Sequence, residues 1–219
     1  MRRKPDPDAR RRELCDAAID LLAEDGSKGL SHLKLDRRLG APDGTSSFYF
    51  RTRTSLIHAV AERVTELDLA DLSAATAEAG HGRTRTTAQP SGLAKLVMQS
   101  STGASFVRTK VRFELMLQAN RDQELATILQ RYSDRYLDLI RDAVRRHHPE
   151  GFDPDTHVSD EQAYVLMTFI SGVMLSLTAG NPTIRTAEHL DGVMSDIVSG
   201  IVSSARHQTP RTSRRSRTT

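Results

Sequence analysis

Apolar side chains recur at the spacing of an α-helix along most of this sequence. The first such run stands at positions i, i+3, i+4, i+7 and i+8 and comprises Leu14, Ala17, Ala18, Leu21 and Leu22. That spacing places all of its members on one face of a helix. Pro7 and Asp8 precede the run as start signals, and Gly26 follows it as a stop signal. We therefore expect an amphipathic helix over residues 9–24 with Asp8 as its N-cap.

The same pattern continues beyond residue 30, interrupted by residues that end helices or form turns. Further helices are expected over residues 32–39, 44–49, 54–79, 93–102, 105–119, 122–148, 159–180 and 186–207. Ser31 is the expected N-cap of the first of these, and residues 80–92, rich in Gly, Thr and Arg, predict a flexible loop. Only 5% of the residues are aromatic and there is no Trp, which disfavours strands. The sequence predicts an all-α fold.

Charge and cysteine content indicate the setting in which such a chain would work. The net charge is +3, and the basic residues are concentrated at the two ends of the sequence, in residues 1–63 and 206–219. Basic ends can indicate a nucleic-acid-binding protein, although solvated surface charge is the commoner explanation. Cys15 is the single cysteine, so no internal disulfide is possible. No apolar segment follows the basic start, and residues 165–177 are too short to span a bilayer. We expect a cytoplasmic protein without membrane contact.

The first fifty residues have the plan of a helix-turn-helix module. Two short expected helices, separated by Gly40 and its neighbours, follow the longer helix over residues 9–24. In a helix-turn-helix, the second short helix enters the major groove of DNA. Small polar side chains on that helix can approach base edges, and the sequence offers them at residues 44–47. The alternative is that these Ser and Thr hydroxyls only cap helices.

The stretch from Arg10 to Val64 resembles the DNA-binding domain of the TetR family of bacterial transcriptional regulators. The matching pieces, in order and without a gap, are the helix ending at Glu24-Asp25-Gly26, the pair Leu30-Ser31, the helix from Leu35 to Gly40 and residues 44–57. The chain departs from the common family pattern at two positions, with Ser47 in place of a tyrosine and Asp36 in place of a small residue. Arg53 stands where the family usually has a lysine, and it keeps the positive charge.

The resemblance and the helix placement together give a candidate DNA-binding set. Its members are Ser31, His32, Lys34, Asp43, Gly44, Thr45, Ser46, Ser47, Phe48, Tyr49 and Arg53. Arg53 is expected to hold a phosphate through its planar guanidinium, and Thr45 is expected to read a base. Arg37 is a further exposed cation that either meets a phosphate or simply faces water.

The C-terminal half carries a different signal, because two of its helices are apolar on more than one face. Nine of the thirteen residues at 165–177 are apolar, and the helix at 186–207 repeats apolar residues from Leu190 to Val202. Pairing both helices with their copies in a four-helix bundle would cover these faces and supply twofold symmetry. A large monomeric core is the alternative.

Between these regions, residues 93–148 mix aromatic and polar groups that could surround a ligand. The candidate ligand-binding set is Phe106, Lys110, Phe113, Leu117, Tyr132, Tyr136 and Met167. Ordinary core packing would produce the same stripes. His147, His148 and His157 lack a carboxylate at metal-binding spacing, so no metal is expected. Neither a cofactor fingerprint nor a catalytic motif is present.

The domain plan that follows has four parts. Residues 1–8 are a flexible basic N-terminus, residues 9–55 a helix-turn-helix domain, residues 56–208 a helical ligand-binding and dimerisation domain, and residues 209–219 a disordered basic tail. The resemblance implies a homodimeric, ligand-responsive regulator, most simply a repressor that a small-molecule effector releases from a palindromic double-stranded DNA operator. A helical dimeric interaction protein without DNA binding is the alternative, and an enzyme is not expected.

Overall fold

The computed structural model describes residues 6–81, 90–146 and 160–208, and every regular element in these ranges is a helix. In chain order the helices are α1 (Pro7–Gly29), α2 (His32–Arg38), α3 (Thr45–Tyr49), α4 (Arg53–His81), α5 (Gly92–Gln99), α6 (Gly103–Ala119), α7 (Gln123–Arg146), α8 (Asp160–Thr178) and α9 (Ala187–Gln208). The all-α prediction is confirmed. Predictions about residues 1–5, 82–89 and 209–219, and about His147, His148 and His157, concern parts of the chain outside the described ranges.

Most helix limits lie close to the predicted ones, and α1 shows the largest difference. This helix begins earlier than expected, because Asp6 rather than Asp8 is its N-cap and accepts a hydrogen bond from the Asp8 amide at 3.0 Å. Residues 6–8, predicted to be flexible, are therefore part of a capped helix end. The predicted stop is a kink at Gly26, whose φ of 67° is left-handed, and one further turn follows it.

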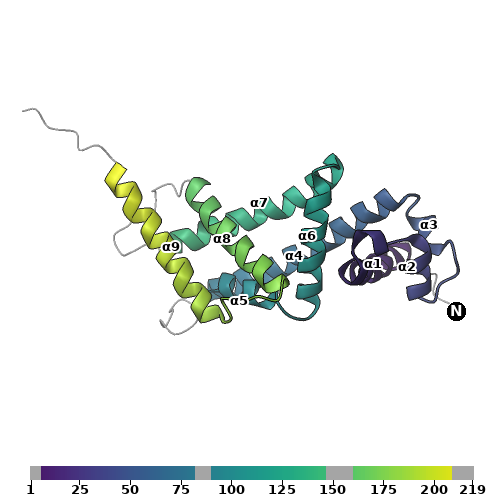
Figure 1. The fold of residues 1–219 in the computed structure, drawn as a ribbon, viewed down its shortest axis with the longest axis horizontal. Coiled ribbons are helices and arrows are strands. Elements are labelled where there is room, and N and C mark those ends of the chain that lie inside the picture. Colours follow the sequence, from purple (N-terminus) through teal and green to yellow (C-terminus); the bar gives the residue numbers. More distant parts are fainter. Residues whose placement is uncertain (1–5, 82–89, 147–159, 209–219) are drawn as a thin grey trace, which may run out of the picture.

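The first three helices lie together at one end of the molecule, and α4 runs from them into the remaining helices (Figure 1). The helix α9 lies toward the opposite end. Because α4 belongs to both regions, a movement of one region relative to the other must involve this helix. None of the helices in the described ranges combines the length and apolar content that a bilayer crossing requires.

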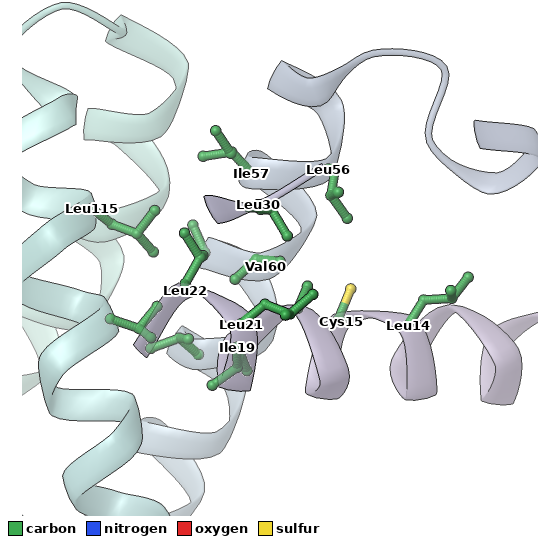
Figure 2. Packing of buried hydrophobic residues seen from close by; sticks show 14 of the residues in the cluster. Leu14, Cys15, Ile19, Leu21, Leu22, Leu30, Leu56, Ile57, Val60 and Leu115 are labelled. Carbon is green, nitrogen blue, oxygen red and sulfur yellow. The ribbon is translucent and has the colours of Figure 1, made fainter. Parts of the chain in front are cut away.

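Two apolar clusters hold the helices together. The first contains Leu14, Leu22, Leu56 and Val60 from α1 and α4, and it also takes in Leu115 from α6. Figure 2 shows these side chains directed toward one another from three helices. The first cluster therefore crosses the boundary at residue 55 that the sequence suggested between two domains.

The second cluster is built from α4, α5, α7, α8 and α9. Its fully buried members include Leu166, Ile170 and Leu190. Burying a side chain of this kind stabilises the fold by about 1.5–3 kcal/mol before entropy costs. Ile170 thus supports the protomer itself, so the apolar residues of α8 are divided between this core and an outer face.

The single cysteine belongs to the first cluster. Cys15 is buried, and that burial raises the pKa of its thiol to about 11. The thiol is therefore protonated at neutral pH, which makes it a packing group rather than a nucleophile.

Candidate functional site

The short helix α3 is held in place by a carboxylate from α2. Asp36 is fully buried, and its two oxygens accept hydrogen bonds from the backbone amides of Gly44 and Ser46, both at 2.8 Å. Gly44 stands at the N-cap of α3 with a left-handed φ of 93° and has no side chain to cap the helix. Asp36 supplies that cap from the neighbouring helix. Its departure from the common TetR pattern therefore has a structural role that the sequence did not predict.

Two residues of the predicted DNA-binding set make hydrogen bonds within the α1–α3 region instead. Ser46 is fully buried and its hydroxyl donates to the His32 carbonyl at 3.2 Å. The His32 ring nitrogen Nε2 in turn donates to the Phe50 carbonyl at 2.8 Å. A buried hydroxyl cannot reach a base edge, so the structure removes Ser46 from the outward face. His32 joins the start of α2 to the end of α3.

The other hydroxyls of the set are engaged in local caps. Ser31 accepts a hydrogen bond from the Lys34 amide at 3.2 Å, which confirms it as the N-cap of α2. Thr45 donates its hydroxyl to the Pro42 carbonyl at 2.6 Å, and Ser47 donates to the Gly44 carbonyl at 2.9 Å. Each hydroxyl oxygen keeps lone pairs that can accept another hydrogen bond.

The outward face of α3 is dominated by one aromatic side chain. Phe48 is 80% exposed, and its ring meets Tyr49 edge to face with 5.3 Å between the centroids. Ser47 and Asp43 are also exposed, whereas Thr45 and Tyr49 are half-buried. An apolar ring held at the surface of a helix of this kind can contact a thymine methyl group in a major groove.

The cations predicted to hold phosphates already have partners within the protein. Lys34 pairs with Asp25 at 3.1 Å between Nζ and Oδ2. Arg53 donates from Nε to the Leu30 carbonyl at 3.2 Å and from Nη2 to the Ser27 carbonyl. Arg53 therefore ties the start of α4 to the end of α1, a role that the sequence did not indicate.

Two other arginines are better placed to hold phosphates. Arg37 on α2 and Arg51, which follows the C-cap Phe50 of α3, are both exposed, and neither has an ion-pair partner in the described part of the chain. The role of Arg37 is open from the sequence alone, and Arg51 is not in the predicted DNA-binding set. The position of Arg51 between the end of α3 and the start of α4 is the sequence signal that could have identified it.

A second candidate site is a small cavity where α4, α5, α6, α7 and α8 meet. It measures about 20 Å³, room for about one water molecule. The wall consists of Asp68, Asp71, Leu96, Val97, Ser100, Ser105, Thr109, Arg112, Tyr132, Tyr136 and Met174. Polar groups supply more of this wall than the aromatic stripe in the sequence suggested.

The predicted ligand-binding set overlaps this wall only in part. Tyr132 and Tyr136 line the cavity, and Met174 stands in it where Met167, two turns earlier on α8, was expected. The remaining predicted residues Phe106, Lys110, Phe113 and Leu117 are outside this wall. On α6 the lining face is Ser105, Thr109 and Arg112, one residue before the predicted stripe. A shift of one residue along an α-helix corresponds to a rotation of about 100°, so the lining face and the predicted stripe point in different directions.

Charged groups form a compact network at the cavity. Asp68 of α4 accepts from Arg108 at 2.9 Å and from Arg112, both of which come from α6. Arg108 also pairs with Asp71. All of these side chains except Asp71 are at most about one-tenth exposed. The network joins α4, the helix that begins beside α1–α3, to the interior of the C-terminal region.

Two tyrosines of α7 complete the arrangement. The guanidinium carbon of Arg112 lies 4.9 Å from the centroid of the Tyr132 ring, and Tyr132 stacks on Tyr136 with 5.7 Å between centroids. The Tyr136 hydroxyl is buried and has no hydrogen-bond partner among the residues that the structure describes. Burial raises the pKa of both phenols, so each hydroxyl stays protonated at neutral pH.

Leu117 lies in a separate surface cleft. It is 73% exposed and lines a cleft of about 650 Å³ together with Arg53, Ile57 and other residues of α4, α6 and the start of α7. Glu114, in the same cleft, accepts a hydrogen bond from the Ser27 amide at 3.2 Å. This contact is another link between α6 and the end of α1.

Comparison with known proteins agrees with the arrangement of a DNA-binding module and a helical C-terminal region. Residues 85–203 match the family model described as the tetracyclin repressor-like C-terminal domain. The chain is 28% identical over 189 residues to the HTH-type transcriptional regulator BetI of Escherichia coli O157:H7, covering 82% of this chain and 88% of that protein.

Solved structures with the same fold include two that hold ligands. A protein from Saccharomonospora viridis, described as a transcriptional regulator and solved with choline, has a TM-score of 0.68 and 19% identity, covering 88% of this chain and 96% of that chain. The multidrug binding protein EbrR, solved with imidazole, has a TM-score of 0.61 and 19% identity, covering 95% and 99%. The family model spans more than half of this sequence. The chain belongs to the TetR family of transcriptional regulators.

Proposed function

We propose that the protein is a homodimeric repressor that binds a palindromic DNA operator through α3 and leaves it when a small molecule enters the cavity beside Asp68. The DNA-binding half of this proposal rests on the exposed face of α3. Ser47 and Phe48 would meet base edges, and Arg37 and Arg51 would hold the flanking phosphates. This division follows the general rule that phosphate contacts set the register and base contacts set the sequence.

The effector half of the proposal rests on the cavity and on the helix that borders it. Asp68 and Asp71 of α4 line the cavity, and the same helix begins at Arg53 beside the DNA-binding module. A ligand that fits the cavity better in one position of α4 than in another shifts the balance between the two positions. The relatives solved with choline and with imidazole support a small-molecule effector for this chain as well.

The dimer would form through the outer faces of α8 and α9. Tyr164, Val165 and Leu175 are large side chains of α8 that remain between 44% and 61% exposed in the protomer. A second copy would cover them, and the resulting twofold axis would present two copies of α3 to successive major grooves, about 34–36 Å apart.

The observation that carries the proposal is the rigid presentation of α3, capped by the buried Asp36, with Phe48 exposed on its surface. The test is selection of DNA from a random library or from genomic fragments by the purified protein. An inverted repeat with half-sites about one helical turn apart is the expected product. Selection of no sequence, or of a site without twofold symmetry, would instead favour a dimeric interaction protein.

A further inference from the structure

The cavity wall holds an internal cation in an unusual position. Arg112 is buried, its guanidinium lies over the face of Tyr132 at 4.9 Å, and it pairs with Asp68. A cation over an aromatic ring and beside a carboxylate is the arrangement by which proteins recognise organic cations. Here the protein's own side chain occupies that position.

The charged groups around Arg112 determine the net charge that would remain in the cavity wall if this side chain left it. In the described part of the chain, the one guanidinium that would still pair with Asp68 and Asp71 is that of Arg108. Without Arg112 the site therefore has an excess of one negative charge next to two stacked tyrosine rings. A ligand cation would restore neutrality, whereas a ligand anion would increase the excess. Burial of unpaired charge is costly, so the site favours a cation.

An independent feature of the same wall is the unused hydroxyl of Tyr136. This side chain is 6% exposed and lines the cavity, and within the described ranges its oxygen has no hydrogen-bond partner. Buried polar groups are rarely left without a partner, and such exceptions are frequent at functional sites. The hydroxyl can bond to a polar group that a ligand brings into the cavity.

We propose that the effector is an organic cation that displaces Arg112 from the Tyr132 ring and from Asp68. This inference rests on the proposed function, and it identifies the chemical class of the effector and the step that follows binding. The cavity holds about one water molecule as it stands. Departure of the Arg112 side chain supplies the additional space, which suits a cation of about the size of that side chain.

Displacement of Arg112 also explains how binding would reach the DNA-binding module. Asp68 of α4 is held to α6 by two arginines, and an entering cation would replace one of these links. The remaining polar contacts between the two helices at this point would be those of Arg108 with Asp68 and Asp71 and the hydrogen bond that the Ser105 hydroxyl donates to Asp71 at 3.3 Å. With one link fewer, α4 would be held less tightly to α6, and a shift between these two helices would change the position of α1, which packs against both of them.

The test measures binding of choline, tetraethylammonium and ethidium to the DNA-free protein by calorimetry. The uncharged isostere of choline, 3,3-dimethylbutan-1-ol, is the matched control for charge. At least one cation is expected to bind, and the isostere is expected not to bind. Arg112→Met removes the internal competitor, so it should tighten binding of that cation by about tenfold or more. Asp68→Asn should abolish binding.

Two further variants separate this exchange from a general effect on folding. Arg112→Lys keeps a competing charge and should leave affinity near that of the wild type. Lys110→Met removes a cation from the exposed face of the same helix and should have no effect. A fold disrupted at position 112 would weaken binding rather than tighten it, and circular dichroism would reveal it directly.

The inference is overturned if none of the three cations binds to the wild type or to Arg112→Met, if Arg112→Met binds no more tightly than the wild type, or if the isostere binds as well as choline. Failure of the proposed function would look different. Because calorimetry uses DNA-free protein, a chain that binds cations in this pattern and selects no DNA would retain the cation site and lose the repressor role.

Discussion

The buried Asp36 carboxylate replaces the side-chain cap that Gly44 cannot provide. Its oxygens satisfy two amides at the start of α3, and a buried amide without a partner costs about 1–3 kcal/mol. The resemblance to other family members marked this position only as a departure. The capping role of Asp36 depends on how close α2 lies to the start of α3. Local sequence patterns do not predict that distance.

The first prediction concerns this cap. Asp36→Ala should lower the free energy of unfolding by about 2–3 kcal/mol, because it leaves the Gly44 and Ser46 amides without a partner. Operator affinity should fall further than stability alone explains, since α3 would lose its fixed orientation. Chemical denaturation and DNA titration measure the two effects. Asp36→Asn, which keeps one acceptor oxygen, should be intermediate, and equal behaviour of both variants would argue against the cap.

The second prediction concerns the exposed ring of Phe48. Phe48→Ala should leave stability nearly unchanged, because the side chain is 80% exposed, and should weaken operator binding by about 1–3 kcal/mol. The informative measurement is a titration with operator in which uracil replaces thymine, since uracil lacks the methyl group. Such a replacement should weaken the wild type and leave Phe48→Ala unaffected. An equal loss in both proteins would show that the ring does not contact a methyl group.

At the scale of helices, the periodicity of apolar residues predicts where each helix lies in the sequence. It predicts less well which face of a helix points toward the cavity. The helix over residues 105–119 was expected and α6 is observed at Gly103–Ala119. Its apolar stripe through Phe106 and Phe113 suggested the ligand face, yet the cavity lies along Ser105, Thr109 and Arg112. Which stripe faces a cavity depends on the partners of each side chain. Asp68 and Asp71 on α4 draw the arginines of α6 inward.

The outer face of α8 could be predicted only in part for the same reason. Two-sided apolarity at residues 165–177 indicated a helix covered on more than one face. It could not tell Ile170, which is fully buried within the protomer, from Leu175, which is 52% exposed. Only the packing of α8 against α6, α7 and α9 separates the two roles.

The third prediction uses that separation. Leu175→Glu should yield a folded monomer, because the side chain is exposed in the protomer and would be buried without a charge partner in the dimer. Light scattering coupled to size exclusion measures the mass. Leu117→Glu changes a leucine outside α8 that is even more exposed, and this variant should remain dimeric. The dimer face would have to lie elsewhere if Leu175→Glu stayed dimeric.

At the scale of the whole molecule, the DNA-binding module and the C-terminal region share one core. Leu115 of α6 packs with side chains of α1 and α4 (Figure 2), and Glu114 accepts a hydrogen bond from Ser27 at the end of α1. A displacement of α6 relative to α4 therefore has to disturb the position of α1. Through this shared packing, a change in the charge network around Asp68 can alter the position of α3 without a flexible linker.

The central claim is that occupation of the cavity and binding of the operator oppose each other. Its most direct measurement is a titration of the selected operator with wild-type protein, with and without a saturating concentration of a cation that calorimetry shows to bind. Operator affinity should fall by about tenfold or more, and by linkage the operator complex should bind the cation more weakly by the same factor. Unchanged operator affinity in the presence of bound cation would contradict the account.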